Sequence, residues 1–196
     1  RLHTLSLHRA AVTDLAPLQG MPIRLLDLSE TKVCDFSPLS GSAVQNLELD
    51  GTPFTNLLQL AALPLGKLDL SGTDIRDISP LGELPLQVMY LNDTDVSDLG
   101  PLKFMPLGDR LELANTRVGD ISVLRGKPLR VLRLDYCTQL RDLSPLADCR
   151  ELEELHIRLP PRDLQSLRDL AKLGRINGLP AAEFWRDYDA RKATQK

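Results

Sequence analysis

Residues 65–85 read L-G-K-L-D-L-S-G-T-D-I-R-D-I-S-P-L-G-E-L-P, and this stretch decides the fold. Its apolar positions follow a fixed spacing and are Leu65, Leu68, Leu70, Ile75, Ile78 and Leu81. A unit this short cannot bury its apolar side alone, because half of its leucines would face water until a neighbouring copy packed on them. The stretch therefore predicts a stack of similar units.

Copies of this unit fill most of the chain. The L-x-x-L-x-L signature begins eight times, at Leu2, Ile23, Val44, Leu65, Leu86, Leu107, Leu129 and Leu152. The first five intervals are 21 residues and the next two are 22 and 23. Alternation of apolar and polar residues over such a short segment predicts a half-buried strand. One strand per repeat must give a parallel sheet, since each turn of the chain returns in the same direction.

The connections between the predicted strands are equally regular. A small polar residue leaves each strand, at Thr31, Thr52, Thr73, Thr94, Thr116 and Cys137, and we expect it to bond the backbone of the adjacent coil. The return limb, D-I-S-P-L at residues 77–81, predicts a short 3₁₀ turn. We expect the Ser hydroxyl of this limb to accept a hydrogen bond from a free amide at the start of the turn.

The L-x-x-L-x-L-x-x-T/C frame and the D-[LIF]-S-P-L limb resemble the bacterial leucine-rich repeat family, in the compact internalin-like variety. The resemblance implies an α/β solenoid, a right-handed superhelix with its parallel β-sheet on the concave side and short 3₁₀ or helical turns on the convex side. The repeats are also similar to those of large bacterial proteins, some of which carry a Ser/Thr kinase domain.

Three regions follow from the change of pattern along the chain. We predict a leucine-rich repeat solenoid over residues 1–162, a C-terminal helical cap over 163–188 and a frayed polar tail over 189–196. In the cap, leucines three residues apart predict a first helix over 164–173 with Asp163 as its N-cap. A turn at Asn177 and Gly178 and a second helix from Pro180 should follow, with Phe184, Trp185 and Tyr188 forming its apolar face. Because the pattern is already in phase at Leu2, we expect further repeats upstream in a longer protein.

Composition and motifs argue against several functions. The net charge of -3 and pI near 5.6 give no reason to expect nucleic acid or an anionic membrane as a partner. No apolar run approaches the roughly 20 residues that insert into a bilayer, and no signal segment opens the sequence, so the compartment stays undetermined between cytoplasm and cell envelope. The three cysteines form no disulfide framework, and the three histidines lie too far apart for a metal site or a Ser-His-Asp set. We therefore predict no enzymatic activity and no cofactor.

The candidate binding surface is the exposed face of the sheet. Residues between and after the paired leucines should form columns across the strands, and we predict that ten of them contact a partner: Asp27, Glu48, Asp50, Asp69, Tyr90, Asn92, Glu112, Arg133, His156 and Arg158. The first four carboxylates should make an acidic patch, and Arg133, His156 and Arg158 a basic patch at the other end. A solvated face that is charged only for solubility is the alternative for any one carboxylate, and a weak Ca²⁺ site is another.

Three functions remain open at this level. The first is a non-catalytic module that recognises a protein or peptide through the concave face. The second is a regulatory or substrate-positioning segment of a multidomain enzyme, such as a bacterial Ser/Thr kinase, and it rests on the family resemblance alone. The third is a structural spacer at the cell surface.

Overall fold

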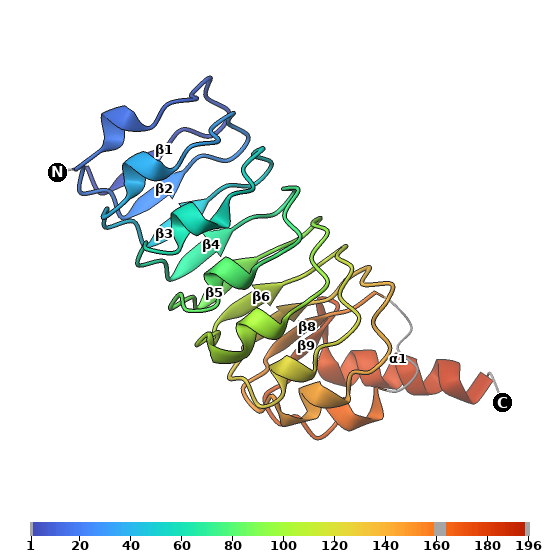
Figure 1. Ribbon diagram of the computed structural model, residues 1–196. Helices are drawn as coiled ribbons and strands as arrows, with labels where there is room; N and C mark the ends of the chain where they lie inside the picture. Colours follow the sequence, from blue (N-terminus) through green and yellow to red (C-terminus); the bar gives the residue numbers. More distant parts are fainter. Residues whose placement is uncertain (1, 159–163, 195–196) are drawn as a thin grey trace.

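The computed structural model describes residues 2–158 and 164–194, and over these residues the chain is a stack of coils with one strand each (Figure 1). The strands are β1 (Thr4–Ser6), β2 (Leu25–Asp27), β3 (Asn46–Glu48), β4 (Lys67–Asp69), β5 (Val88–Tyr90), β6 (Arg110–Glu112), β7 (Val131–Arg133), β8 (Glu154–His156), β9 (Arg175–Ile176) and β10 (Leu179–Pro180). They form one sheet in chain order. The pairs from β1 to β9 are parallel, and β10 returns antiparallel to β9.

The leucine signature sets the register of this sheet. Leu68 pairs with Leu47 on one side and with Met89 on the other, so equivalent residues of successive repeats lie opposite each other. The inward side chains form one continuous aliphatic core, in which Leu65, Leu68 and Leu70 have no exposed surface. The predicted strands and their parallel pairing are confirmed.

Short 3₁₀ helices line the side of the stack opposite the sheet (Figure 1). They are η1 (Ala16–Leu18), η2 (Ser37–Leu39), η3 (Leu57–Leu60), η4 (Ser79–Leu81), η5 (Gly100–Phe104), η6 (Ser122–Leu124), η7 (Ser144–Asp148) and η8 (Gln165–Leu167). The predicted Ser cap is wrong. In η4 the carboxylate of Asp77 accepts from the Ser79 amide at 2.8 Å, and the Ser79 hydroxyl itself donates to Asp77 at 3.0 Å. A carboxylate two residues earlier closes a tight side-chain turn.

A ladder of threonines seals each turn out of a strand, but with a different partner from the expected one. The buried Thr73 hydroxyl donates to Leu70 O of its own coil at 2.6 Å, and the equivalent threonines do the same. Only the Cys137 thiol reaches the preceding coil within this ladder, at 3.1 Å from Leu113 O. A hydroxyl on a β-branched residue is short enough to close on the carbonyl three residues back, which satisfies that group inside the coil.

The predicted helix over residues 164–173 is wrong. Leu164 precedes η8 and Leu167 ends it, and Leu173 and Ile176 repeat the L-x-x-L spacing to give a ninth parallel strand. Apolar residues three apart also occur in other return limbs, such as Ile78, Leu81 and Leu84, so here the spacing belongs to another coil instead of an α-helix. Asp163, the expected N-cap, lies outside the described residues.

A hairpin and one α-helix follow the last coil. Asn177 and Gly178 have φ of 53° and 80° and join β9 to β10, as the tight two-residue hairpin turn requires. Helix α1 (Ala181–Thr194) then packs Phe184, Trp185 and Tyr188 against the core, with the Phe184 and Trp185 ring centroids 5.3 Å apart. This is the predicted aromatic face. The helix continues through residues for which the sequence predicts a frayed tail.

In the described part of the chain no helix has the length and apolar character needed to cross a bilayer. The division of the chain into separate domains stays a prediction.

The threonine ladder gives a test of what holds each coil. Thr73→Val keeps the shape of the side chain and removes the hydroxyl that satisfies Leu70 O. We expect the free energy of unfolding to fall by about 1–2 kcal/mol, since the buried Leu70 carbonyl then keeps only the longer hydrogen bond, at 3.4 Å, from the Thr73 amide. Thermal denaturation measures this, and Thr55→Val, at an exposed position, is the matched control. Equal melting temperatures for the two variants would contradict a stabilising ladder.

Candidate functional site

All ten predicted site residues lie on the outward face of the sheet, called the sheet face below. Strand pairing places one column in register, with members Ser6, Asp27, Glu48, Asp69, Tyr90, Glu112, Arg133 and His156. Neighbours in such a column are about 4.8 Å apart. A second column, two residues further along each repeat, holds Asp50, Asn92 and Arg158 together with Asp135. The predicted columns are confirmed, whereas the binding role of their residues stays a prediction.

The acidic patch, defined by Asp27, Glu48, Asp50 and Asp69, contains carboxylates in different environments. Asp27 accepts from the Ser6 hydroxyl at 2.7 Å and from the Ser29 amide at 3.0 Å. Partial burial alone would raise its pKa, but these hydrogen bonds and nearby His8 together hold the pKa of Asp27 below its ordinary value. The charged form of the Asp27 carboxylate is therefore stabilised by the structure.

Asp50 and Asp69 are less well compensated. Burial raises the pKa of Asp69 despite a 2.8 Å hydrogen bond from the Ser71 amide, and Asp50 and Glu48 raise it further. Burial also raises the pKa of Asp50, with added repulsion from Glu30 and Asp93. Like charges on adjacent coils repel each other, so the charged form of both carboxylates is disfavoured.

A lysine that was not among the predicted site residues partly neutralises this patch. Lys67 Nζ lies 2.8 Å from Glu48 Oε1 and 5.4 Å from the centre of the Tyr90 ring. Its position in the neighbouring column and next strand is visible in the sequence, so the pairing could have been found from register. Lys67 and Tyr90 lie at the edge of the acidic patch that is nearest to β5.

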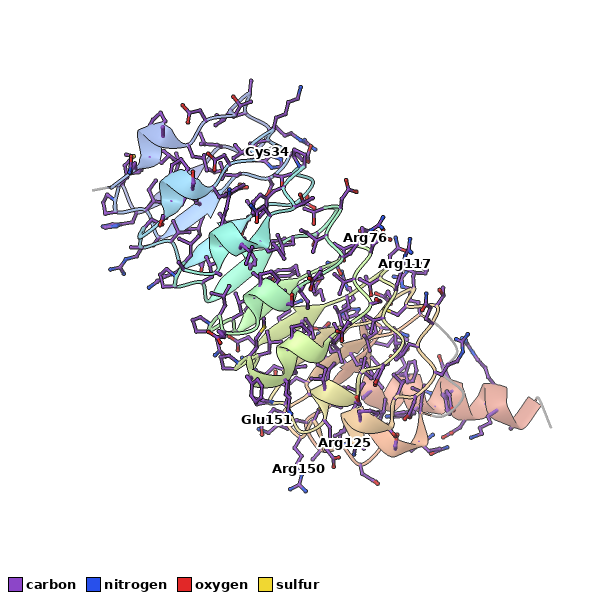
Figure 2. All side chains as sticks on the ribbon, viewed as in Figure 1. Cys34, Arg76, Arg117, Arg125, Arg150 and Glu151 are labelled. Atoms are coloured by element: carbon purple, nitrogen blue, oxygen red, sulfur yellow. The ribbon has the colours of Figure 1, made fainter. Side chains whose placement is uncertain are left out.

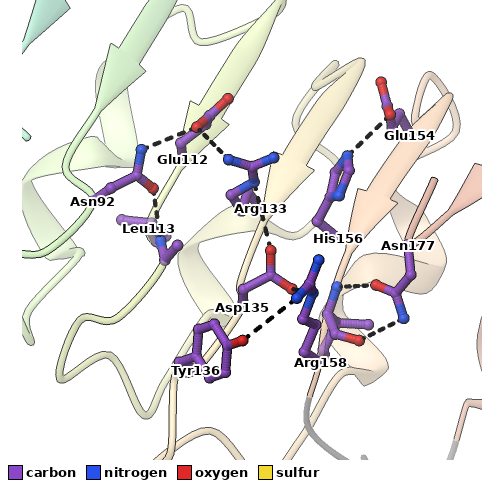
Figure 3. Close-up of polar contacts among 12 residues, drawn as sticks. Asn92, Glu112, Leu113, Arg133, Asp135, Tyr136, Glu154, His156, Arg158 and Asn177 are labelled. Atoms are coloured by element: carbon purple, nitrogen blue, oxygen red, sulfur yellow. Dashed lines mark hydrogen bonds and ion pairs between the residues drawn. The ribbon is translucent and has the colours of Figure 1, made fainter.

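The expected basic patch at the other end is wrong, because each of its residues faces an acid (Figure 3). Arg133 lies 3.4 Å from Glu112 and 3.5 Å from Asp135, and Arg158 lies 3.9 Å from Asp135. His156 Nε2 is 2.9 Å from Glu154. The basic residues at this end therefore form ion pairs within the chain. Their acidic partners lie in the same or the neighbouring column of the sequence.

Glu112 is the centre of this charged cluster. Its side chain is 8% exposed and contacts Arg110 at 2.8 Å and the amide of Asn92 at 3.0 Å as well as Arg133. Asn92 in turn accepts from the Ala114 amide at 2.9 Å. A buried carboxylate held by two guanidinium groups and an amide is fixed in place, so Glu112 and Asn92 serve the sheet more than an outside partner.

The described residues offer little for catalysis or metal binding. Within residues 2–158 and 164–194 no group of three His, Cys, Asp or Glu side chains is placed to hold a metal ion. Cys137 and Cys149 are buried, and burial raises the pKa of both thiols. Cys34 is exposed (Figure 2).

Solved structures that resemble this chain include two internalins. Internalin C2 from Listeria monocytogenes superposes with a TM-score of 0.77 at 29% sequence identity, over 89% of this chain and 78% of that chain. The functional domain of InlJ from the same species, described as including a cysteine ladder, gives a TM-score of 0.46 at 15% identity over 89% of this chain and 52% of that chain. No family model and no curated protein sequence matches the chain.

The two aspartates Asp27 and Asp69 test the electrostatics of the sheet face as a matched pair. Each accepts an amide hydrogen bond from the serine two residues later. Because the pKa of Asp69 is raised, its ionisation destabilises the fold at pH values above its ordinary pKa near 3.8. This destabilisation disappears as the pH falls. We expect Asp69→Asn to raise the melting temperature at pH 7 by about 1–3 °C.

Asp27→Asn should have the opposite sign. The lowered pKa of Asp27 means that its charge stabilises the fold above its ordinary pKa and that this contribution is lost as the pH falls through the lowered value. The variant should melt at a lower temperature than the parent at pH 7. Melting curves at pH 7 and pH 3 measure both effects, and a shift of the same sign in the two variants at pH 7 would refute the assignment.

Proposed function

We propose that this chain, an internalin-like leucine-rich repeat protein of the bacterial type, is a non-catalytic module that binds a protein or peptide on its sheet face. The partner that fits best is basic, because it would compensate the carboxylates of the acidic patch. Internalin C2, at 29% identity, supports the general role of a protein-binding repeat. The regulatory segment of an enzyme and the structural spacer have no specific observation in their favour.

One observation carries the proposal: two carboxylates on the sheet face, Asp50 and Asp69, have raised pKa values because of burial and like-charge neighbours. A lysine or arginine brought to this patch would pair with charges that the chain itself leaves poorly compensated. The gain per pair is modest at a partly exposed site, about 0.2–1 kcal/mol, so several pairs must act together. A patch spread over strands β2, β3 and β4 allows such multiple contacts.

Tyr90 adds an apolar element next to the patch. Its ring is half-buried, and it lies in the same column as Asp69, one strand further on. A third column, two residues before the Tyr90 column in each repeat, contains Leu25, Val88 and Val131, which are also partly exposed. Interfaces need aromatic or aliphatic anchors beside their charges, so Tyr90 is the residue that we expect to anchor the partner.

The charge requirement is testable with a neutralised sheet face. The triple variant Asp27→Asn, Glu48→Gln, Asp69→Asn keeps the side-chain shapes and removes three negative charges. Against a displayed library of short peptides of graded net charge, we expect the parent to retain basic peptides and the variant to bind them about tenfold more weakly. Binding should also weaken as salt rises.

The control for this variant carries the same change in net charge elsewhere. Glu83→Gln, Asp169→Asn, Asp187→Asn neutralises three exposed carboxylates outside the sheet face and should bind as the parent does. If both triple variants lose binding equally, only overall charge matters. If neither does, or if the parent retains no basic peptide, the proposed function is wrong.

Binding should depend on pH in a direction fixed by the raised pKa values. A cation stabilises the ionised forms of Asp50 and Asp69, so binding releases protons and the affinity rises as the pH rises from about 4 to 7. Titration of a retained basic peptide at several pH values measures this slope. The double variant Asp50→Asn, Asp69→Asn should flatten it, whereas Asp27→Asn should change it less, since the pKa of Asp27 is lowered. A slope unaffected by the double variant would contradict the assignment of these two groups.

A further inference from the structure

A hollow of about 480 Å³ lies outside the sheet face, where the chain leaves strands β4 to β7. This hollow is called the rim site, and residues that line it include Asp93, Asp95, Asn115, Tyr136, Thr138 and Gln139. Its volume is in the range of small-ligand sites, about 300–1,000 Å³. Its lining is almost wholly polar, which is unusual for such sites, so its ligand must be rich in hydrogen-bonding groups.

Tyr136 is the one aromatic side chain among the described residues that line the rim site. It is 52% exposed, and its backbone has φ of 61°. The same turn of the earlier repeats also has positive φ, and it holds Arg9, Glu30, Gly51, Gly72, Asp93 and Asn115. The left-handed turn is therefore common to the repeats, and in this repeat it carries an exposed aromatic side chain beside the hollow.

The hydroxyl of Tyr136 is directed to one neighbour. It lies 3.5 Å from Arg158 Nη1, and Arg158 is itself 3.9 Å from Asp135 (Figure 3). This contact holds the polar end of the side chain beside Arg158, which follows β8. The aromatic ring is left as the apolar wall of an otherwise polar site.

The polar groups of the rim site are held in fixed orientations by each other. Asn115 Nδ2 donates to Asp93 Oδ1 at 2.8 Å. Asp95 lies 2.7 Å from Arg117 and 3.0 Å from Arg76, two arginines that project at the same edge of the stack (Figure 2). Planar amide and carboxylate groups have two lone pairs on each oxygen, so Asp93, Asn115 and Gln139 keep capacity for further hydrogen bonds.

We propose that the rim site binds a neutral or amino saccharide, with one face of a sugar ring stacked on Tyr136 and its hydroxyls bonded to Asp93, Asn115 and Gln139. A pyranose ring presents C–H groups on one face, which pack on an aromatic ring, and hydroxyls around its edge, which both donate and accept. A protein partner would need an apolar pocket for an anchor residue, and this lining supplies none.

Charge restricts the class of saccharide. The lining contains the carboxylates of Asp74, Asp93 and Asp95 against the guanidinium of Arg117. An excess of negative charge repels sulfate, phosphate and sugar carboxylates. Neutral or amino sugars are therefore expected to bind, and sulfated ones are not.

An array of neutral, amino and sulfated oligosaccharides tests this with the intact chain. We expect the parent to bind at least one neutral or amino oligosaccharide, with affinity reduced at least tenfold in Tyr136→Gly and within threefold of the parent in Tyr136→Phe. Glycine occupies the same turn in two other repeats, so the glycine variant should fold and melt no lower than the parent. Should it fail to fold, Tyr136→Asn, with the residue type of Asn115, replaces it.

Two controls separate the rim site from other surfaces. Phe104→Ala removes the 82% exposed ring of η5, on the other side of the stack, and should leave saccharide binding unchanged. The neutralised sheet-face triple variant should also bind saccharide as the parent does. The proposal is overturned if no neutral or amino oligosaccharide binds, if the Tyr136 variant without a ring binds as tightly as the parent, or if sulfated sugars are preferred.

Discussion

The packing of each coil's leucines on those of the next coil is the interaction on which the rest of this structure depends. A coil with three-residue strands such as β4 has too few backbone hydrogen bonds of its own to persist, so its stability comes from its neighbours. Full burial of Leu65, Leu68 and Leu70 fixes the register of the strands. Register then fixes which exposed residues meet, and the chemistry of the surface follows from the core.

Because equivalent positions stack, one substitution in a repeat changes the environment of two neighbours. Asp69 next to Glu48 and Tyr90 is an example, since burial raises its pKa and the carboxylates Glu48 and Asp50 of the preceding coil raise it further. At the other end the same stacking brings Arg133 between Glu112 and Asp135, and the charges cancel. The sheet face is thus unevenly compensated, and the poorly compensated carboxylates lie toward its first half.

The turn out of each strand shows how the same scaffold admits variation. Threonine recurs in five repeats of the ladder because its hydroxyl satisfies a carbonyl of the same coil, as Thr73 does for Leu70, and Cys137 replaces it in a sixth. The preceding position needs a left-handed backbone but no particular side chain, and it holds Gly72 in one repeat and Tyr136 in another. Specific surface features can therefore arise at that position without disturbing the core, at the cost of local backbone strain.

The sequence by itself determined the repeat, the parallel sheet, the columns of the sheet face and the aromatic face of α1, because each follows from spacing against a period of 2, of 21 or, in the helix, of about 3.6. It did not separate a ninth coil from a helix at residues 164–173, since leucines three apart suit both, and only packing of Leu173 and Ile176 onto the preceding coil decides between them. The Asp77 cap, the pairing of Arg133 with Asp135 and the exposure of Tyr136 were likewise decided by tertiary structure. Each depends on side-chain direction and distance between coils, which a one-dimensional pattern does not contain.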